Sequence, residues 1–232
     1  LLQSPNYFGL VEDGETVAKI VHENRSKFIL SVNPIACALY KTPGEVGADV
    51  AVGEGQPLGM PLSFGGPYLG FMATTKALMR KLPGRIVGET TDDRGERAFV
   101  LTLQAREQHI RREKASSNIC SNQALCAMTA AVYMAAMGET GLREVARQCH
   151  AKAAYLRGEL ARIGFAPLHE GPFFHEFVTA CPAGKDELVS ALAEKGILAG
   201  LPVDGGILWC ATEMNSRADI DELIAAIGEV LA

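Results

Sequence analysis

The chain has 232 residues, of which 48% are hydrophobic, and its mean hydropathy is +0.10. This is enough apolar material for one sizeable core, or for one and a half domains. A net charge of −5, a pI near 5.6 and an aromatic content of 6% argue against a nucleic-acid-binding protein, which needs a cationic surface and stacking side chains.

The sequence also excludes several other classes. It has no run of about 18 apolar residues and no cationic start followed by an apolar signal segment, so we expect a cytoplasmic protein without a membrane segment. No two cysteines form a C-x-x-C pair, and the Cys149-His150 pair lacks a second pair of ligands, so no metal site is predicted. Buried free thiols are expected at the six cysteines: Cys37, Cys120, Cys126, Cys149, Cys181 and Cys210.

The first part of the chain alternates short apolar strands with helical patterns. It begins at Leu1 without an initiator Met, in a segment that resembles the end of a strand, so we expect a piece of a longer polypeptide. Strands are predicted at residues 27–33, 48–53 and 68–74, with a short helix at 34–40 between the first two. Glu12 and Asp13 are expected to begin a helix. This order predicts an α/β fold with a parallel sheet.

The second part predicts a compact α+β unit. Ser216 and Asp219 form a variant of the capping box before the last helix. Trp209 is expected in the core of this unit, and His175 is either a buried, hydrogen-bonded histidine or a catalytic one. An apolar helix at 118–137 is expected to precede this unit, whose own expected elements are helices at 142–163, 186–195 and 218–231 and strands at 174–180 and 207–212. We therefore predict a large α/β domain at residues 1–139 and a small C-terminal α+β domain at 140–232.

Residues 106–123, Arg-Glu-Gln-His-Ile-Arg-Arg-Glu-Lys-Ala-Ser-Ser-Asn-Ile-Cys-Ser-Asn-Gln, are the most informative segment. Guanidinium groups offer forked donors to carboxylates and phosphates. The Ser-Ser-Asn step adds hydroxyl donors at a predicted helix N-terminus, where an anion is favoured. The alternative is a solvated charged face followed by a routine helix cap.

Two glycine-rich loops, at residues 53–59 and 64–70, match neither a Walker A loop nor the G-x-G-x-x-G fingerprint. Glycines after a strand let the backbone approach a ligand or another subunit, or simply form a turn. Together with the 106–123 block, Gly-Ala-Asp-Val-Ala-Val-Gly-Glu-Gly-Gln-Pro-Leu-Gly (47–59) and Ser-Phe-Gly-Gly-Pro-Tyr-Leu-Gly-Phe (63–71) resemble the glycine cleavage system P-protein. Residues 3–9 and 82–88 fit too. The likeness is to the N-terminal half of that protein, or to its alpha subunit (subunit 1) where bacteria split it, and within that subunit to its C-terminal portion.

The resemblance implies a pyridoxal-phosphate-dependent glycine dehydrogenase (decarboxylating). In that family glycine loses CO2 and its aminomethyl group passes to the lipoyl arm of the H-protein, and the cofactor acts as an electron sink. The implied fold is PLP-dependent transferase-like (fold type I, aspartate aminotransferase type), with part of the large domain plus the small C-terminal domain. The implied partners are the P-protein beta subunit (subunit 2), the lipoylated H-protein, and the T- and L-proteins.

One departure from the family pattern decides where the cofactor is expected. The half of the family that carries the cofactor has a His-Lys pair before its Gly-Gly-Pro loop, whereas this chain has Gln56, whose amide cannot form an imine. Lys114 is the alternative attachment point within this chain. No catalytic residue is therefore predicted, and the resemblance implies pyridoxal phosphate bound covalently to the partner beta subunit.

The resemblance leaves supporting roles for the 106–123 block. Ser116, Ser117 and Asn118 are expected to reach the cofactor phosphate of the partner subunit. A second set is expected to hold a substrate carboxylate, a phosphate or acidic H-protein side chains, or else to pair with acids at the subunit interface: Arg106, His109, Arg111 and Arg112. Two rival hypotheses remain, a non-catalytic scaffold or regulatory subunit with the same fold, and a desulfurase-like enzyme with its own lysine.

Overall fold

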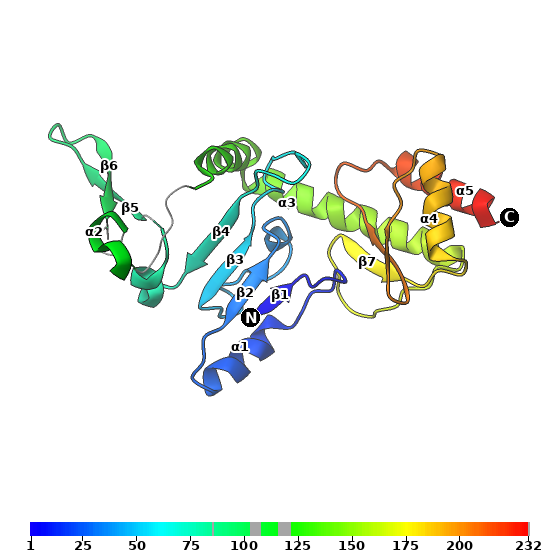
Figure 1. Ribbon diagram of the computed structural model, residues 1–232, viewed down its shortest axis with the longest axis horizontal. Coiled ribbons are helices and arrows are strands. Elements are labelled where there is room, and N and C mark those ends of the chain that lie inside the picture. The colour runs from blue at the N-terminus through cyan, green and yellow to red at the C-terminus, as the bar shows by residue number, and fades with distance from the viewer. Residues whose placement is uncertain (85, 103–107, 116–121, 232) are drawn as a thin grey trace.

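The computed structural model describes residues 1–84, 86–102, 108–115 and 122–231 (Figure 1). Its larger sheet has the order β1 (Leu2–Ser4), β2 (Ile29–Val32), β3 (Val50–Glu54) and β4 (Gly70–Thr74). The first three strands are parallel, as predicted, and β4 pairs antiparallel with β3. The carboxyl ends of β1, β2 and β3 therefore lie at one edge of the sheet.

Helix α1 (Gly14–Glu23) connects β1 to β2 and begins where the sequence predicts. Asp13 is its N-cap, and its carboxylate accepts a hydrogen bond from the backbone N–H of Thr16 at 3.1 Å. A short 3₁₀ helix, η1 (Ala36–Ala38), lies between β2 and β3 in the segment predicted as a helix at 34–40.

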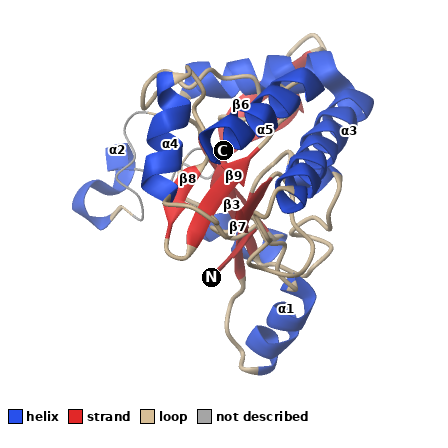
Figure 2. Ribbon diagram, turned by 90° about the vertical axis from the view of Figure 1, so that its right-hand side faces the viewer, coloured by secondary structure: helices blue, strands red, loops and turns tan. Residues whose placement is uncertain are grey.

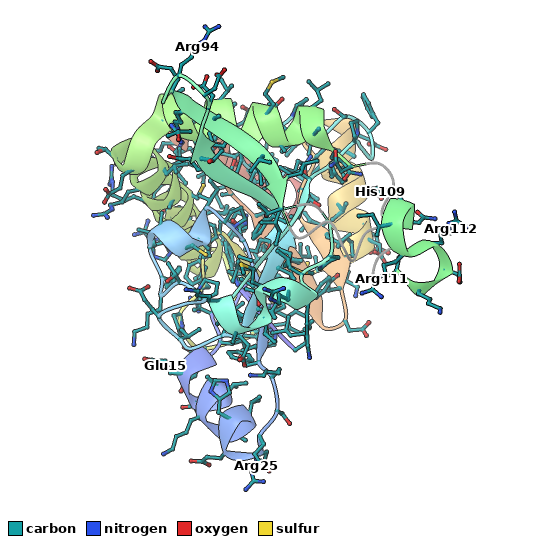
Figure 3. The ribbon with its side chains drawn as sticks, turned by 90° about the vertical axis from the view of Figure 1, so that its left-hand side faces the viewer. Glu15, Arg25, Arg94, His109, Arg111 and Arg112 are labelled. Carbon is teal, nitrogen blue, oxygen red and sulfur yellow. The ribbon has the colours of Figure 1, made fainter. Side chains whose placement is uncertain are left out.

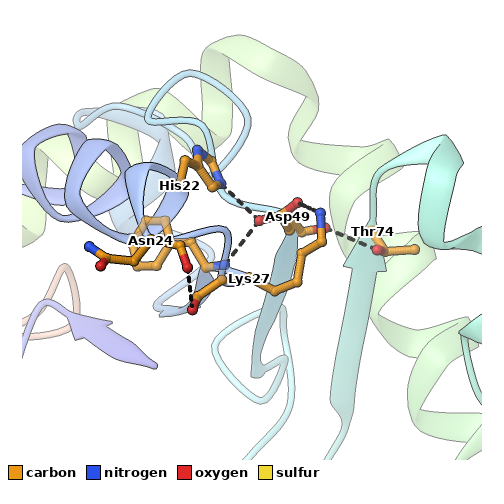
Figure 4. Close-up of polar contacts among 7 residues, drawn as sticks. His22, Asn24, Lys27, Asp49 and Thr74 are labelled. Atoms are coloured by element: carbon orange, nitrogen blue, oxygen red, sulfur yellow. Dashed lines mark hydrogen bonds and ion pairs between the residues drawn. The ribbon is translucent and has the colours of Figure 1, made fainter.

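Asp49, just before β3, ties together the elements around it (Figure 4). Its carboxylate accepts hydrogen bonds at 2.9 Å from the backbone N–H of Phe28, Lys27 Nζ and His22 Nε2. Its backbone carbonyl accepts a hydrogen bond from Thr74 Oγ1 at 3.0 Å. The bond from Phe28, helped by those from Lys27 and His22, holds the pKa of the Asp49 carboxyl far below its ordinary value.

Helix α3 (Ala124–Arg162) runs from the larger sheet into the C-terminal region and bends at Gly138, where φ is +62° (Figure 1). It joins the two helices predicted at 118–137 and 142–163. The expected start is wrong, because Asn122 and Gln123 are not helical and the helix begins at Ala124. The domain boundary predicted after residue 139 lies next to the bend at Gly138.

The C-terminal region is a three-stranded antiparallel sheet covered by helices (Figure 2). The strands are β7 (Glu176–Thr179), β8 (Leu201–Val203) and β9 (Gly206–Cys210), in the order β7-β9-β8, and the helices are α4 (Lys185–Glu194) and α5 (Arg217–Leu231). Trp209 is 1% exposed, and its indole N–H donates to Thr179 Oγ1 at 2.9 Å, which confirms its predicted place in the core. The capping box is also confirmed, because Ser216 Oγ accepts from the backbone N–H of Asp219 at 3.1 Å and the Asp219 carboxylate accepts from that of Ser216 at 2.6 Å.

An arm that the sequence did not predict projects from the far end of the larger sheet (Figure 1). It follows the 3₁₀ helix η2 (Lys76–Lys81) and contains the antiparallel hairpin of β5 (Ile86–Thr91) and β6 (Arg97–Thr102). After residues 103–107 come α2 (Gln108–Arg111) and the 3₁₀ helix η4 (Arg112–Lys114).

The cysteines bear out the predicted burial only in part. Five of the six lie in the described part of the chain, and these five are free thiols. Cys126 and Cys149 are buried, but Cys210 is exposed, because it ends β9 with its side chain on the face opposite Trp209. Cys120 lies outside the described residues.

Helix α3 contains an 18-residue stretch that is apolar enough, by composition and length, to cross a membrane. Its uncharged part, residues 124–137, would extend only about 21 Å, against a hydrocarbon core of about 30 Å. The rest of the helix is charged on one face and buries Ala146, Ala153 and Leu160 in the protein interior. We therefore regard α3 as a helix that packs against protein.

Candidate functional site

A cleft of about 490 Å³ lies at the carboxyl ends of β1, β2 and β3, between the larger sheet and the C-terminal region. In open α/β sheets, ligands bind preferentially at this edge. The polar side chains that line the cleft come from segments far apart in the sequence, and the argument depends on six of them: Asn6, Asn33, Glu54, Gln56, His175 and Glu176.

Several of these side chains already serve the loops that carry them. Asn6 Oδ1 accepts hydrogen bonds from the backbone N–H groups of Phe8 and Leu10 at 2.9 and 3.1 Å. Asn33 Oδ1 accepts from the backbone N–H of Ile35 at 2.9 Å and so holds the start of η1. Their amides therefore shape the rim of the cleft rather than its chemistry.

Gln56 stands where the family pattern led us to look for a lysine. Its backbone N–H donates to Glu54 Oε1 at 3.1 Å, and its side-chain Nε2 donates to the carbonyl of Pro61 at 3.2 Å. Glu54 Oε1 also accepts from the backbone N–H of Leu69 at 2.7 Å. Glu54 thus joins the two ends of the loop that links β3 to β4, and Gln56 holds the first part of this loop.

His175 and Glu176 close the cleft from the side of the small sheet. Burial lowers the pKa of His175 to about 4, so its imidazole is neutral at pH 7. Its Nδ1 is buried and has no hydrogen-bond partner among the described residues, so the expected satisfied histidine is not found there. Burial also raises the pKa of the Glu176 carboxyl.

The charge of the cleft does not suit pyridoxal phosphate. Among the described residues, no lysine or arginine lines it, and Glu54 and Glu176 are acidic. A phosphate needs cationic or clustered N–H donors, and the cofactor aldehyde needs an amine. The described lining therefore does not fit this cofactor.

Local packing and backbone conformation explain why glycine is required at several positions of the two loops. A Cβ at Gly53 would lie 2.4 Å from the Phe71 ring, and one at Gly59 would lie 2.7 Å from the Tyr133 ring. These two glycines let the chain's own side chains approach the backbone. In the second loop a Cβ at Gly65 would meet no atom, and glycine is needed there because φ is +111°.

The cationic block lies away from the cleft, on the arm. His109 and Arg111 belong to α2 and Arg112 to η4, and Figure 3 shows all three on the short helical segment that stands off from the body of the molecule. All three are exposed, and Arg112 has a φ of +52° where α2 gives way to η4. The structure therefore brings these three residues together, but not to the cleft of the same chain.

The remaining predicted site residues, Arg106, Ser116, Ser117 and Asn118, lie outside the described residues. Helix α3 begins at Ala124 with Gln123 as its N-cap, and Gln123 makes no side-chain capping bond. Their expected role toward a partner phosphate stays a prediction.

The cleft was not predicted, although the sequence contains a signal for it. Asn6, Asn33 and Glu54 follow or end three successive parallel strands, and such positions meet at one edge of a sheet. Glu176 could not be found in this way, because it reaches the cleft from the C-terminal region, more than 100 residues further along the chain.

Comparisons with known proteins support one family. The chain matches the family described as "Glycine cleavage system P-protein" over residues 1–227. A probable glycine dehydrogenase (decarboxylating) subunit 1 from Moorella thermoacetica is 51% identical over 240 residues, which cover 100% of this chain and 54% of that protein. One of the same description from Syntrophomonas wolfei is 51% identical over 98% of this chain and 52% of that protein. The chain thus spans about half the length of these curated relatives.

Solved structures agree. The crystal structure of a glycine decarboxylase (P-protein) of the glycine cleavage system, in inhibitor-bound form, is 44% identical, with a TM-score of 0.93 over 99% of this chain and 54% of that chain. A NifS-like protein from Rickettsia africae has a TM-score of 0.69 at 12% identity, over 99% of this chain and 60% of its own, and so shows the fold alone. The fold is PLP-dependent fold type I, as predicted.

Proposed function

Because the chain belongs to the glycine cleavage system P-protein family, we propose that it acts as the alpha subunit (subunit 1) of that enzyme in the cytoplasm. In this role it supports the decarboxylation of glycine and the transfer of the aminomethyl group to the lipoyl arm of the H-protein. The Schiff-base lysine and pyridoxal phosphate belong to the partner beta subunit. The T- and L-proteins of the same system are its further partners.

The main support for placing the cofactor on the partner subunit is the composition of the cleft around Gln56. Pyridoxal phosphate supplies the electron sink for decarboxylation and needs an amine and a phosphate seat. The Gln56 amide offers no amine and instead holds Pro61, and no described lysine or arginine lines the cleft. The described lining thus offers neither feature, which supports a role in completing a site on another subunit.

The cationic segment suits this supporting role. The exposed side chains of Arg111 and Arg112 lie on the projecting arm rather than at the chain's own cleft. There they can hold a carboxylate or phosphate that a neighbouring subunit brings. Ser116, Ser117 and Asn118 follow the same segment in sequence and would add donors to a partner-bound phosphate.

The cleft also argues against the desulfurase-like alternative. All nine lysines of the chain lie in its described part, and none lines the cleft. A desulfurase-like enzyme would need one of them there. A non-catalytic scaffold would also have no lysine in the cleft. Measuring whether the second subunit needs this chain for activity therefore distinguishes the scaffold alternative from our proposal.

The test uses full-length subunit 1 and the second subunit of the same enzyme, each alone and mixed, with pyridoxal phosphate. Borohydride reduction followed by peptide mass mapping should find pyridoxyl-lysine on the second subunit alone. Exchange of labelled CO2 into glycine should require both subunits. A labelled lysine in this chain, Lys114 above all, would overturn the proposal, and full activity of the second subunit by itself would favour a scaffold.

A further inference from the structure

The cleft around Gln56 contains unpaired polar groups that the proposed function does not use. The Glu176 carboxylate is half-buried, burial raises its pKa, and no cation among the described residues offsets this. Next to it, the buried Nδ1 of His175 has no partner in the same part of the chain. Folded proteins rarely leave such groups unpaired, so the two together indicate that the cleft holds a ligand.

The charge of the cleft favours a cation. Glu54 and Glu176 line it, no described lysine or arginine does, and the imidazole of His175 is neutral at pH 7. Glu54 Oε1 accepts two backbone N–H bonds, which leave its carboxylate charge in place. An anionic ligand would be repelled by both carboxylates, whereas a cationic one would offset a negative charge that burial makes costly.

The size of the cleft and its side chains favour an organic cation over a metal ion. The cleft has a volume of about 490 Å³, whereas one water molecule takes up about 30 Å³. The described residues contain no group of three or more His, Cys, Asp or Glu side chains placed to hold a metal ion. An ammonium group needs only hydrogen-bond acceptors, which a carboxylate supplies.

A second cavity indicates what the rest of the ligand is like. It has a volume of about 430 Å³ and shares Glu176 and Leu208 with the cleft as lining residues. Its other walls are mainly aliphatic and include Ile197, Leu201 and Leu223. An apolar group attached to the ammonium would gain affinity by leaving water for these walls.

We propose that the cleft binds a small molecule with a primary ammonium head, which pairs with Glu176, and a short apolar body, which extends into the adjoining cavity. The same lining that does not fit pyridoxal phosphate suits this ligand, because it supplies negative charge and no phosphate seat. The inference does not rest on the proposed function, since it concerns only the cleft of this chain.

The first test measures binding to full-length subunit 1, without pyridoxal phosphate, by isothermal titration calorimetry. n-Butylammonium should bind about tenfold or more tightly than butyrate, because only the cation can pair with Glu176. It should also bind about tenfold or more tightly than methylammonium, because three more methylene groups leave water. Equal affinity of butylammonium and butyrate, equal affinity of the two ammonium ions, or no binding of butylammonium would overturn the inference.

The second test locates the bound ammonium. Glu176→Gln keeps the shape of the side chain but removes its charge, and should weaken butylammonium binding about tenfold. Glu194→Gln makes the same change at an exposed residue of α4 that does not line the cleft, and should change the affinity less than about twofold. Equal affinities of the two variants would overturn the inference, and circular dichroism checks that both are folded.

An NMR measurement on the unmodified protein keeps the test independent of how the variants fold. The imidazole C–H signals of His175, assigned by their loss in His175→Gln, should shift when butylammonium is added, because His175 lines the same cleft. Signals that stay in place at saturating butylammonium would mean that it binds elsewhere, which contradicts the proposal. None of these measurements needs the second subunit or the cofactor, so their failure would leave the proposed function to the labelling experiment above.

Discussion

Asp49 contributes to the stability of the larger sheet through three hydrogen bonds to one carboxylate. Asp49→Asn keeps the shape but loses the charge that attracts Lys27 and one acceptor of the three hydrogen bonds. We expect a loss of about 2 kcal/mol in the free energy of unfolding, measured by urea denaturation. Glu89→Gln, which breaks an exposed ion pair with Arg97, is the matched control and should cost less than about 1 kcal/mol.

Asp49 should also shape the acid sensitivity of the protein. Its pKa in the folded chain lies below the ordinary value of 3.8, so the unfolded chain binds the proton first as pH falls. The stability that Asp49 contributes is therefore present above about pH 4 and is lost as pH falls through the folded pKa. Urea curves at pH 6 and pH 3.5 should differ less for Asp49→Asn than for the unmodified chain, and equal differences would contradict this account.

A substitution at Gln56 tests directly whether the cleft can bind pyridoxal phosphate. Gln56→Lys restores an amine but not a phosphate seat, because no lysine or arginine lines the described cleft. We expect no pyridoxyl-lysine at position 56 after incubation with pyridoxal phosphate and borohydride reduction, while the second subunit in the same mixture is labelled. Stoichiometric label at position 56 would show that the cleft still accepts the cofactor.

Helix α5 offers a test at the scale of one element. Ser216→Ala removes the side-chain oxygen that accepts from the Asp219 N–H, and should cost about 1 kcal/mol of unfolding free energy. Ser190→Ala on α4 is the matched control, because Ser190 Oγ bonds only to the Asp186 carbonyl within its own helix. The control should change stability by less than about 0.5 kcal/mol in the same urea titration, and equal losses in both variants would contradict the capping role.

Elements with strong local signals were predictable, and those set by distant contacts were not. The Ser216–Asp219 cap and the Asp13 cap are read from neighbouring residues, and both are confirmed. The antiparallel direction of β4 depends on how residues 55–69 return the chain to the sheet, which periodicity does not encode. The start of α3 was placed too early, because the described residues 122–123 are not helical and the helix begins at Ala124.

At the scale of the whole molecule, the fold was predictable from family-specific blocks, whereas the cleft required the three-dimensional assembly. Gln56 was singled out by its sequence context alone. Its bond to Pro61 is local to the loop between β3 and β4, whereas the presence of Glu176 in the same cleft depends on the packing of the C-terminal region against the larger sheet. A one-dimensional pattern contains the residue types of such a site but not which of them face one another.

The whole chain should self-associate when it is isolated, because its longest helix is only partly covered. Residues 124–137 of α3 carry no charge, and Leu125, Met128 and Val132 are 70%, 59% and 63% exposed. Contiguous apolar surface of this kind marks an interaction site or an aggregation hazard. Light scattering of the isolated chain at about 10–100 µM should therefore show species larger than a monomer.

A double substitution on the same helix tests whether its exposed apolar face causes the self-association. Leu125→Gln combined with Val132→Gln removes apolar surface without touching the buried side chains of Cys126 and Ala130, so the fold should survive. It should raise the concentration needed for self-association by about tenfold, because burial of two large aliphatic side chains is lost. Leu198→Gln, at a 96% exposed position in the C-terminal region, should have little effect, since it leaves the apolar face of α3 unchanged. A chain that stays monomeric at 100 µM, or an equal effect of the two variants, would mean that this helix face is not the surface that associates.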